Sequence, residues 1–276
     1  MAHFQVEKLH ENACRDKIQA MDSWLIETPA AIAGGIAGLT VYGAAYPRAQ
    51  LFGPAVCRTG APNKLAITFD DGPNPAITPR LLDLLAKHNA RATFFLVGKF
   101  VRQCPELTKE ILARGHALGN HTDTHPNLFL CGQRKTEEEL KRCGEAIRQA
   151  TGVEPRWFRP PFGFRSPWLR KFVDRLGMQT VMWTLIPGDW RVKPAEWLVK
   201  RMNPIAEHAR KKLPPGRGYG GGLTGDILCL HDGYHRHLNG DRAHTVAALE
   251  YWLPRWSDLG LEFVTMDETL RKTVEA

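Results

Sequence analysis

The sequence from residue 64 onward alternates between short apolar runs and amphipathic segments. The apolar runs, which we predict to be strands, cover residues 64–69, 92–97, 116–120, 156–159, 179–184, 227–230 and 261–265. Helix signals follow them, such as Thr78-Pro79 and the capping boxes that begin at Thr136 and Thr265. Because alternating strands and helices favour a parallel sheet, we predict an α/β fold with about seven parallel strands, each followed by a helix.

Polar side chains stand where several of these strands end. A parallel sheet of this kind can close into a barrel, whose active site lies at the carboxyl ends of the strands. The residues at the predicted strand ends are Asp70, Asp71, His121, Arg159, Asp189 and His231. We therefore expect these side chains, which are scattered along the chain, to meet at one mouth of the barrel.

Asp70 and Asp71 are adjacent at the end of the first predicted strand. Side chains of a strand alternate between its two faces, so the two carboxylates should point in different directions. That arrangement suits two tasks, with one carboxylate binding a metal and the other handling a proton. The alternative is a solvated turn, since Asp-Gly-Pro is also common in turns.

His121 and His125 are four residues apart, a spacing that lets two imidazoles bind one metal. The glutamate that follows the first histidine in zinc proteases is replaced by Thr122, and Pro126 disfavours helical geometry at His125. We therefore predict a loop or short turn. With Asp71 the pair forms a set of two histidines and one carboxylate that suits a hydrolytic metal, while two surface histidines are the alternative.

Arg159 precedes Pro160 and Pro161, which have no N–H, so Phe162 carries the next free backbone donor. A rigid turn with one free N–H suits an oxyanion, although a stiff surface turn would read the same way. His231 ends another predicted strand and could act as a general acid opposite a metal.

Five motifs, "TFDDGP", "HTDTH", "RPPFG", "GDW" and "LHD", occur in this order between residues 64 and 270. In this respect the chain resembles the polysaccharide deacetylases, the family-four carbohydrate esterases that include chitooligosaccharide deacetylases. The resemblance implies a deformed (β/α) barrel of about seven parallel strands. It also implies one divalent metal, usually zinc, with cobalt and nickel as alternatives.

The resemblance also implies roles for individual residues. Asp71, His121 and His125 would bind the metal, Asp70 would be the general base, and Arg159 would orient it.

The remaining roles concern the leaving group and the substrate. His231 would be the general acid, supported by Asp189, and Trp190 would form the wall of the acetyl pocket. Phe162 and Cys229 stand at substrate-binding positions, where the family often has Tyr and Leu. Ile186 replaces an aspartate that often begins the fourth motif.

The function implied is a metal-dependent hydrolase that removes N-acetyl groups from glycans containing N-acetylglucosamine, of the chitooligosaccharide or peptidoglycan type. A sugar O-acetyl esterase, a deformylase or a small-molecule amidase on the same barrel is one alternative. A non-catalytic glycan-binding barrel is another, although such a protein should have lost a ligand or the base.

The formal net charge of +8 comes from scattered basic residues. Short clusters such as Arg210 to Lys212 lack interleaved aromatic residues, so a nucleic-acid partner is disfavoured and an acetylated glycan is the expected partner. The six cysteines form no Cys-x-x-Cys pair, and we expect them to be mostly buried apolar residues.

The N-terminal segment, residues 1–60, precedes the predicted catalytic barrel at 61–276. Residues 28–47 carry no charge and include Gly34 and Gly38 at the spacing of helix dimers. A membrane anchor and a helix packed on protein are both consistent with this composition. The sequence thus favours neither the cell envelope nor the cytoplasm, and we expect the barrel to fold without residues 28–47.

Overall fold

The computed structural model describes residues 31–211 and 224–269 of the chain. Contacts divide the chain into two units, Met1–Gly43 and Ala44–Ala276. In the first unit, residues 31–43 are helical, and the rest of the predicted anchor at its N-terminal side lies outside the described residues. Within the described ranges, no helix combines the length and apolar character needed to span a bilayer.

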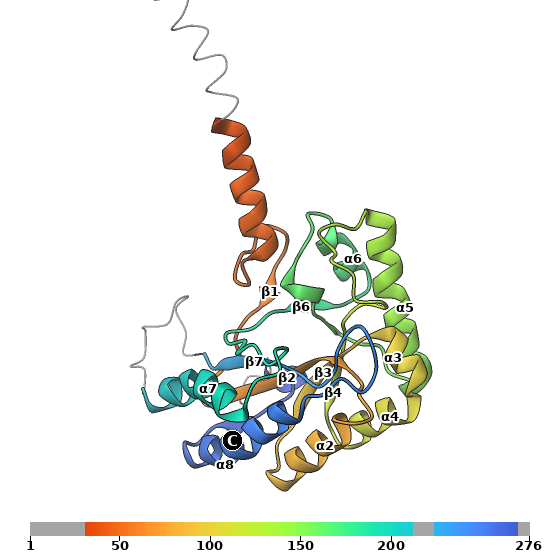
Figure 1. The fold of residues 1–276 in the computed structure, drawn as a ribbon. Helices are drawn as coiled ribbons and strands as arrows, with labels where there is room; N and C mark the ends of the chain where they lie inside the picture. Colours follow the sequence, from red (N-terminus) through yellow and green to blue (C-terminus); the bar gives the residue numbers. More distant parts are fainter. Residues whose placement is uncertain (1–30, 212–223, 270–276) are drawn as a thin grey trace, which may run out of the picture. The chain divides into compact units, whose positions relative to one another are not determined.

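The second unit is built on one parallel sheet (Figure 1). Its strands are β1 (Ala55–Val56), β2 (Lys64–Gly72), β3 (Ala92–Leu96), β4 (Ala117–Asn120), β5 (Trp157–Phe158), β6 (Gln179–Val181), β7 (Asp226–His231) and β8 (Glu262–Phe263). The order is β1-β6-β5-β4-β3-β2-β7, and β8 pairs with β2. Leu185 forms a parallel bridge with Leu228, which joins the segment after β6 to β7 and curls the sheet into a deformed barrel. The predicted fold is confirmed, apart from β1, which is too short to have a recognisable pattern.

Helices follow the strands, as the alternating pattern predicts. They are α2 (Thr78–Lys87), α3 (Gly98–Gln103), α4 (Pro105–Ala113), α5 (Gln133–Thr151), η1 (Pro161–Gly163), α6 (Leu169–Arg175), α7 (Ala195–Arg210), α8 (Ala243–Asp258) and α9 (Met266–Thr269). Helices α2 to α5 cover neighbouring parts of the sheet, and α7 packs beside α8 (Figure 1).

Strand β2 separates two layers of the core because its side chains alternate. Ile67 and Phe69 join the large apolar cluster that includes buried side chains of α2, α7 and α8. Ala66 belongs to a separate cluster with side chains of β3, β5 and β6, inside the curled sheet. Thr68 lies on the same side as Ala66 and donates a hydrogen bond to the carbonyl of Leu228 at 2.7 Å. The interior face therefore becomes polar toward the carboxyl end of β2.

Two of the predicted helix starts are wrong, and in each case the side chain has another partner. Helix α2 begins at Thr78 itself, whose hydroxyl donates to buried Asp232. Helix α5 begins before Thr136, and the predicted capping residue Glu139 instead accepts hydrogen bonds from the N–H and hydroxyl of Thr124, both at 2.7 Å. The predicted capping box at Thr265 is confirmed, since Glu268 accepts from the N–H of Thr265 at 2.9 Å.

The five cysteines in the described ranges are free thiols, and Cys14 lies outside those ranges. Cys143 and Cys229 are buried, while Cys57, Cys104 and Cys131 are partly buried.

The division between the units falls earlier than residue 60, because residues 44–60 pack within the second unit. The buried guanidinium of Arg165 donates to the carbonyls of Ala49 and Tyr46, both at 2.6 Å. Its backbone N–H donates to the carbonyl of Ala44 at 3.1 Å. The segment before β1 therefore supplies acceptors to a buried cation.

We predict that a chain shortened to begin at Ala44 unfolds at the same denaturant concentration as the full chain, whereas one that begins at Gln50 is less stable. The second deletion removes three carbonyl partners of Arg165, and leaving buried donors unpaired costs about 1–3 kcal/mol each. Urea unfolding followed by tryptophan fluorescence measures the difference. Equal midpoints for the two shortened chains would contradict this role of residues 44–49.

Candidate active site

A cavity of about 440 Å³ opens at the carboxyl ends of the strands. Seven of the predicted site residues line it: Asp70, Asp71, His121, His125, Phe162, Trp190 and His231. The convergence expected from the strand-end positions is therefore observed. Arg159 and Asp189 lie behind this wall and are fully buried.

Both adjacent aspartates face the cavity because β2 is irregular at its end. The pairing of β2 with β3 shifts register between Asp70 and Gly72, and Asp71 has a φ of 72°. The left-handed backbone at Asp71 turns its side chain back toward the side that Asp70 occupies, contrary to the simple alternation expected from the sequence. Gly233 packs directly against the carbonyl of Asp71, where any Cβ would clash.

Asp71, His121 and His125 form a compact set of potential metal ligands, with one donor atom from each lying within 4.8 Å of the others. Oδ1 of Asp71 lies 3.1 Å from Nε2 of His125 and 3.7 Å from Nε2 of His121. The Nδ1 of His121 contacts the carbonyl of Arg159 at 2.7 Å. Since a carbonyl can only accept, Nδ1 carries the proton and Nε2 presents its lone pair.

The electrostatics of this set suit a cation. Burial lowers the pKa of His125 to about 3, against the opposing charge of Asp71, so its imidazole is neutral. Burial disfavours ionisation of Asp71, but contact with His235 and the neighbouring histidines outweigh it and hold the pKa of this carboxyl well below its usual range. Oδ1 of Asp71 is buried and has no hydrogen-bond partner among the described residues. An ionised oxygen facing the Nε2 atoms of two imidazoles fits a divalent metal.

The backbone around these potential ligands is strained. Thr122, His125 and Phe162 have φ values of 68°, 61° and 58°. The hydroxyl of Thr122 accepts from the N–H of His125 at 3.1 Å, which fixes the turn between the two histidines. The predicted loop is confirmed, and strain of this kind is typical of functional sites.

Asp70 is held by a buried ion pair rather than by the histidines. Nη1 of Arg159 lies 2.8 Å from Oδ1 of Asp70 and 2.7 Å from the hydroxyl of Thr68. The other guanidinium nitrogens donate to the carbonyls of Val181 and Met182, both at 3.3 Å. Asp70 therefore has a fixed orientation and a permanent counter-charge beside the cavity.

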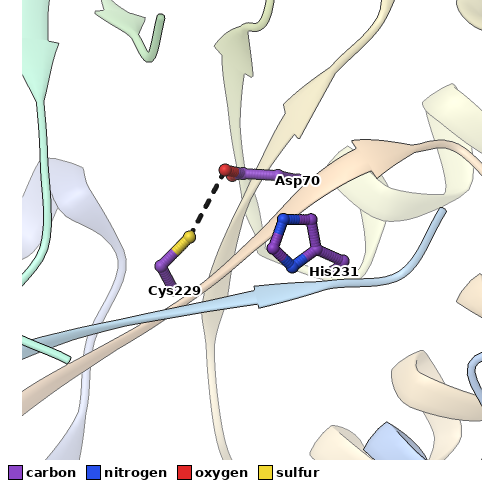
Figure 2. Close-up of side chains that lie close together, drawn as sticks. All are labelled: Asp70, Cys229 and His231. Carbon is purple, nitrogen blue, oxygen red and sulfur yellow. Dashed lines mark hydrogen bonds between the residues drawn. The ribbon is translucent and has the colours of Figure 1, made fainter. Parts of the chain in front are cut away.

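Cys229 lies beneath Asp70 and does not line the cavity. Its thiol is fully buried and donates to Oδ2 of Asp70 at 3.4 Å (Figure 2). The prediction that Cys229 contacts substrate is therefore wrong, since the side chain belongs to the support of Asp70. Burial, followed by the charge of Asp70, raises the pKa of this thiol well above its ordinary value.

Asp70, Cys229 and His231 are also close enough together to be considered as a metal site (Figure 2). The guanidinium of Arg159 stands 2.8 Å from Asp70 and 3.5 Å from the sulfur of Cys229. A second cation at this place would face that fixed positive charge, so this group suits proton chemistry better than metal binding.

His231 is fixed by both oxygens of Asp189. Oδ1 contacts Nδ1 of His231 at 2.8 Å, and Oδ2 accepts from the His231 backbone N–H at 2.7 Å. Thr245 also donates to Oδ2, at 3.1 Å. Burial lowers the pKa of His231, but the charge and hydrogen bond of Asp189 and the charges of Asp71 and Asp70 outweigh burial and raise the pKa to about 9.

Two aromatic side chains stand at the mouth of the cavity. Phe162 is 53% exposed, and its N–H makes no hydrogen bond within the described ranges. Trp190 is 43% exposed, and its ring lies 5.6 Å from that of His231. Ile186 forms an apolar part of the wall.

Sequence reasoning missed several lining residues, of which His235 and Arg242 are the most polar. Both follow the "LHD" motif, where histidines recur in "HDGYHRH", a signal that could have marked this loop. Arg242 is 3% exposed, and its Nε and Nη2 have no hydrogen-bond partner in the described part of the chain. Asp232 of the same motif lies behind the cavity, where burial raises its pKa to about 7.

Comparison with known proteins finds relatives named as deacetylases, and structural neighbours that include a CE4 family pseudoenzyme from Bacillus anthracis with a TM-score of 0.65 at 25% identity, covering 79% of this chain and 69% of its own. A family model described as polysaccharide deacetylase matches residues 58–181. A peptidoglycan-N-acetylglucosamine deacetylase of Bacillus cereus is 38% identical over 75% of this chain and 88% of its own length. A chitooligosaccharide deacetylase of Azorhizobium caulinodans is 33% identical over 74% of this chain and 93% of its own length. Among solved structures, a peptidoglycan N-acetylglucosamine deacetylase aligns with a TM-score of 0.67 at 26% identity, covering 80% of this chain and 94% of its own.

The contact between His231 and Asp189 yields a prediction that is independent of activity. Because Asp189 favours the imidazolium, metal-free protein should show His231 protonated up to about pH 9. Replacing Asp189 with Asn removes the charge, so the titration should move to lower pH by roughly one to two units. Histidine proton NMR measures both curves, and an unmoved His231 titration would disprove the pairing.

Proposed function

The chain belongs to the polysaccharide deacetylase family, and from this we propose that it hydrolyses N-acetyl groups of glycans that contain N-acetylglucosamine. The observation that carries the proposal is that three groups of side chains with different chemistry meet at one cavity. A set of metal-ligand type, Asp71 with two histidines, adjoins a carboxylate paired with Arg159 and a histidine paired with Asp189. Metal-assisted hydrolysis of an amide can use all three: a cation for the carbonyl and water, a base for the water and an acid for the leaving nitrogen.

Asp71, His121 and His125 would hold the metal, which is divalent throughout this family. When bound, the cation would polarise the acetamide carbonyl and make the attacking water more acidic. Two imidazoles and one carboxylate with open positions are typical of catalytic zinc, so zinc is the metal we propose.

Asp70 would take the proton from the attacking water. Its ion pair with Arg159 at 2.8 Å supports this role, because the guanidinium holds the carboxylate in a fixed orientation and cannot itself accept a proton. The N–H of Phe162 would donate to the oxyanion that forms on the carbonyl oxygen.

His231 would deliver a proton to the departing nitrogen. Its partner Asp189 favours the charged imidazole, which is the form that a general acid requires. Trp190, beside the His231 ring, would enclose the acetyl methyl group. Once the nitrogen is protonated, the carbon–nitrogen bond breaks and acetate and the free amine leave.

One charged side chain in the wall of the cavity, Arg242, indicates which glycan the site would bind. The buried guanidinium of Arg242 has unpaired nitrogens, and no ion pair to it is found in the described part of the chain. A buried cation without a counter-charge is unfavourable, so a substrate that carries a negative charge would stabilise it. Of the two glycans named for the relatives, we therefore favour the peptidoglycan type, which carries carboxylates on its stem peptides and peptide-free lactyl groups, over neutral chitooligosaccharide.

Two alternatives on the same barrel differ in substrate or in activity. An O-acetyl esterase, deformylase or small amidase would use the same groups on another acyl compound. A non-catalytic barrel would bind glycan and release no acetate. The side chains proposed as metal ligands, general base and general acid are all present in this chain. Their presence argues against the non-catalytic barrel.

We predict metal-dependent acetate release from N-acetylated glycans. The full-length protein is assayed on peptidoglycan fragments, neutral N-acetylglucosamine oligosaccharides, an O-acetylated sugar and a formylated amine, before and after chelation. We expect N-acetyl substrates to be cleaved, chelation to abolish cleavage and zinc to restore it. Acidic fragments should have a higher kcat/KM than neutral ones, by roughly tenfold for one charge-assisted contact.

The other outcomes decide between the alternatives. Faster cleavage of the O-acetylated or formylated compound would contradict the N-deacetylase assignment in favour of the related hydrolases. Glycan binding with no acyl release would identify a non-catalytic barrel.

A further inference from the structure

His235 lies beside Asp71, His121 and His125. It belongs to none of the five sequence motifs and has no role in the proposed mechanism. It lies in the loop between β7 and α8 and lines the cavity. The loop is held in place, because the amide of Asn74 donates to the carbonyls of Asp232 and Gly240, both at 2.8 Å. Lys99 donates to the carbonyl of His235 itself at 2.6 Å. The position of the ring is therefore determined by the fold.

The ring of His235 contacts two of the three metal-ligand type residues. It stacks on His125 with ring centroids 4.4 Å apart and an interplanar angle of 17°. Its Nδ1 lies 3.7 Å from Oδ2 of Asp71, which is within ion-pair range and longer than a hydrogen bond. Oδ2 is the oxygen turned away from His121 and His125, since Oδ1 is the one that faces their Nε2 atoms.

The two oxygens of the Asp71 carboxylate thus face different groups. One oxygen points at the place where a cation would bind, and the other points at an imidazole nitrogen. Groups that hold the free oxygen of a ligating carboxylate fix its orientation, and their loss typically weakens metal binding 10- to 100-fold. His235 is not itself in the compact ligand set, which comprises Asp71, His121 and His125.

We propose that His235 is a positioning residue of the metal site, whose Nδ1 side attracts Oδ2 of Asp71 across 3.7 Å so that Oδ1 faces the cation. The inference rests on the proposed metal-binding role of Asp71 but not on the identity of the substrate. His235 acts through Asp71 and needs no contact with substrate.

Three substitutions separate the contributions of the ring and its nitrogen. His235→Phe keeps an aromatic ring to stack on His125 but removes Nδ1. His235→Asn removes the ring but places an amide N–H close to the position of Nδ1. His237→Phe is the matched control, because His237 lies in the same loop, is exposed, and directs its Nδ1 to the carbonyl of Leu238 at 2.9 Å.

The measurement is the Kd for Zn²⁺ of metal-free full-length protein, obtained by competition with a chromophoric chelator. We expect His235→Phe to raise Kd about 10- to 100-fold. His235→Asn should stay within about threefold of the unsubstituted protein, and His237→Phe should equal it. Wild-type affinity in His235→Phe, or an Asn variant as weak as the Phe variant, would overturn the proposal.

The visible spectrum of the Co²⁺-loaded protein tests whether His235 is instead a ligand. The spectrum of His235→Phe should keep the bands of the unsubstituted protein, whereas His125→Phe, which removes a proposed ligand, should change them. A change in His235→Phe like that in His125→Phe would overturn the positioning role. Because both readouts measure metal binding, absence of deacetylase activity would count against the proposed function and leave this test unaffected.

Discussion

The buried ion pair between Arg159 and Asp70 is the interaction on which the rest of the site depends. Arg159 is fully buried, and its guanidinium joins Asp70 to Thr68, Val181 and Met182, which come from or follow β2 and β6. Its carbonyl accepts from His121, so one residue orients both the proposed base and a proposed metal ligand. Removing one partner of a buried pair typically costs about 3–5 kcal/mol, so the pair also couples the stability of the barrel to its chemistry.

The ion pair explains how two adjacent carboxylates can have different chemistry. Asp70 forms an ion pair with the guanidinium of Arg159. Asp71 has a left-handed backbone conformation that turns its side chain toward two imidazoles. The separation is electrostatic as well as geometric. Asp70 lies between Arg159 and the set of potential metal ligands, 2.8 Å from the guanidinium and 3.9 Å from Nε2 of His121. Asp70 is therefore bound to the guanidinium through Oδ1 and still lines the cavity.

The sequence predicted the order of strands and helices and the convergence of the strand-end residues, because both follow from local periodicity and from the geometry of parallel sheets. It failed where a tertiary contact outweighs the local signal. Glu139 reads as a capping residue but holds Thr124 beside the histidine turn. Cys229 occupies a motif position yet lies below Asp70, since it is two residues deeper in β7 than His231, on the same face of the strand. The bulge at Asp71 has no local sequence signal, so the shared orientation of the two aspartates was not predicted.

The most direct test of this division compares Asp70→Asn with Asp71→Asn in the full-length protein, measuring bound metal and kcat/KM in each. The account predicts that Asp70→Asn retains one metal per chain and loses about 10²- to 10⁴-fold in kcat/KM, as expected for removal of a general base. Asp71→Asn should lose the metal together with activity. Loss of metal from the Asp70 variant with retention in the Asp71 variant would contradict the account.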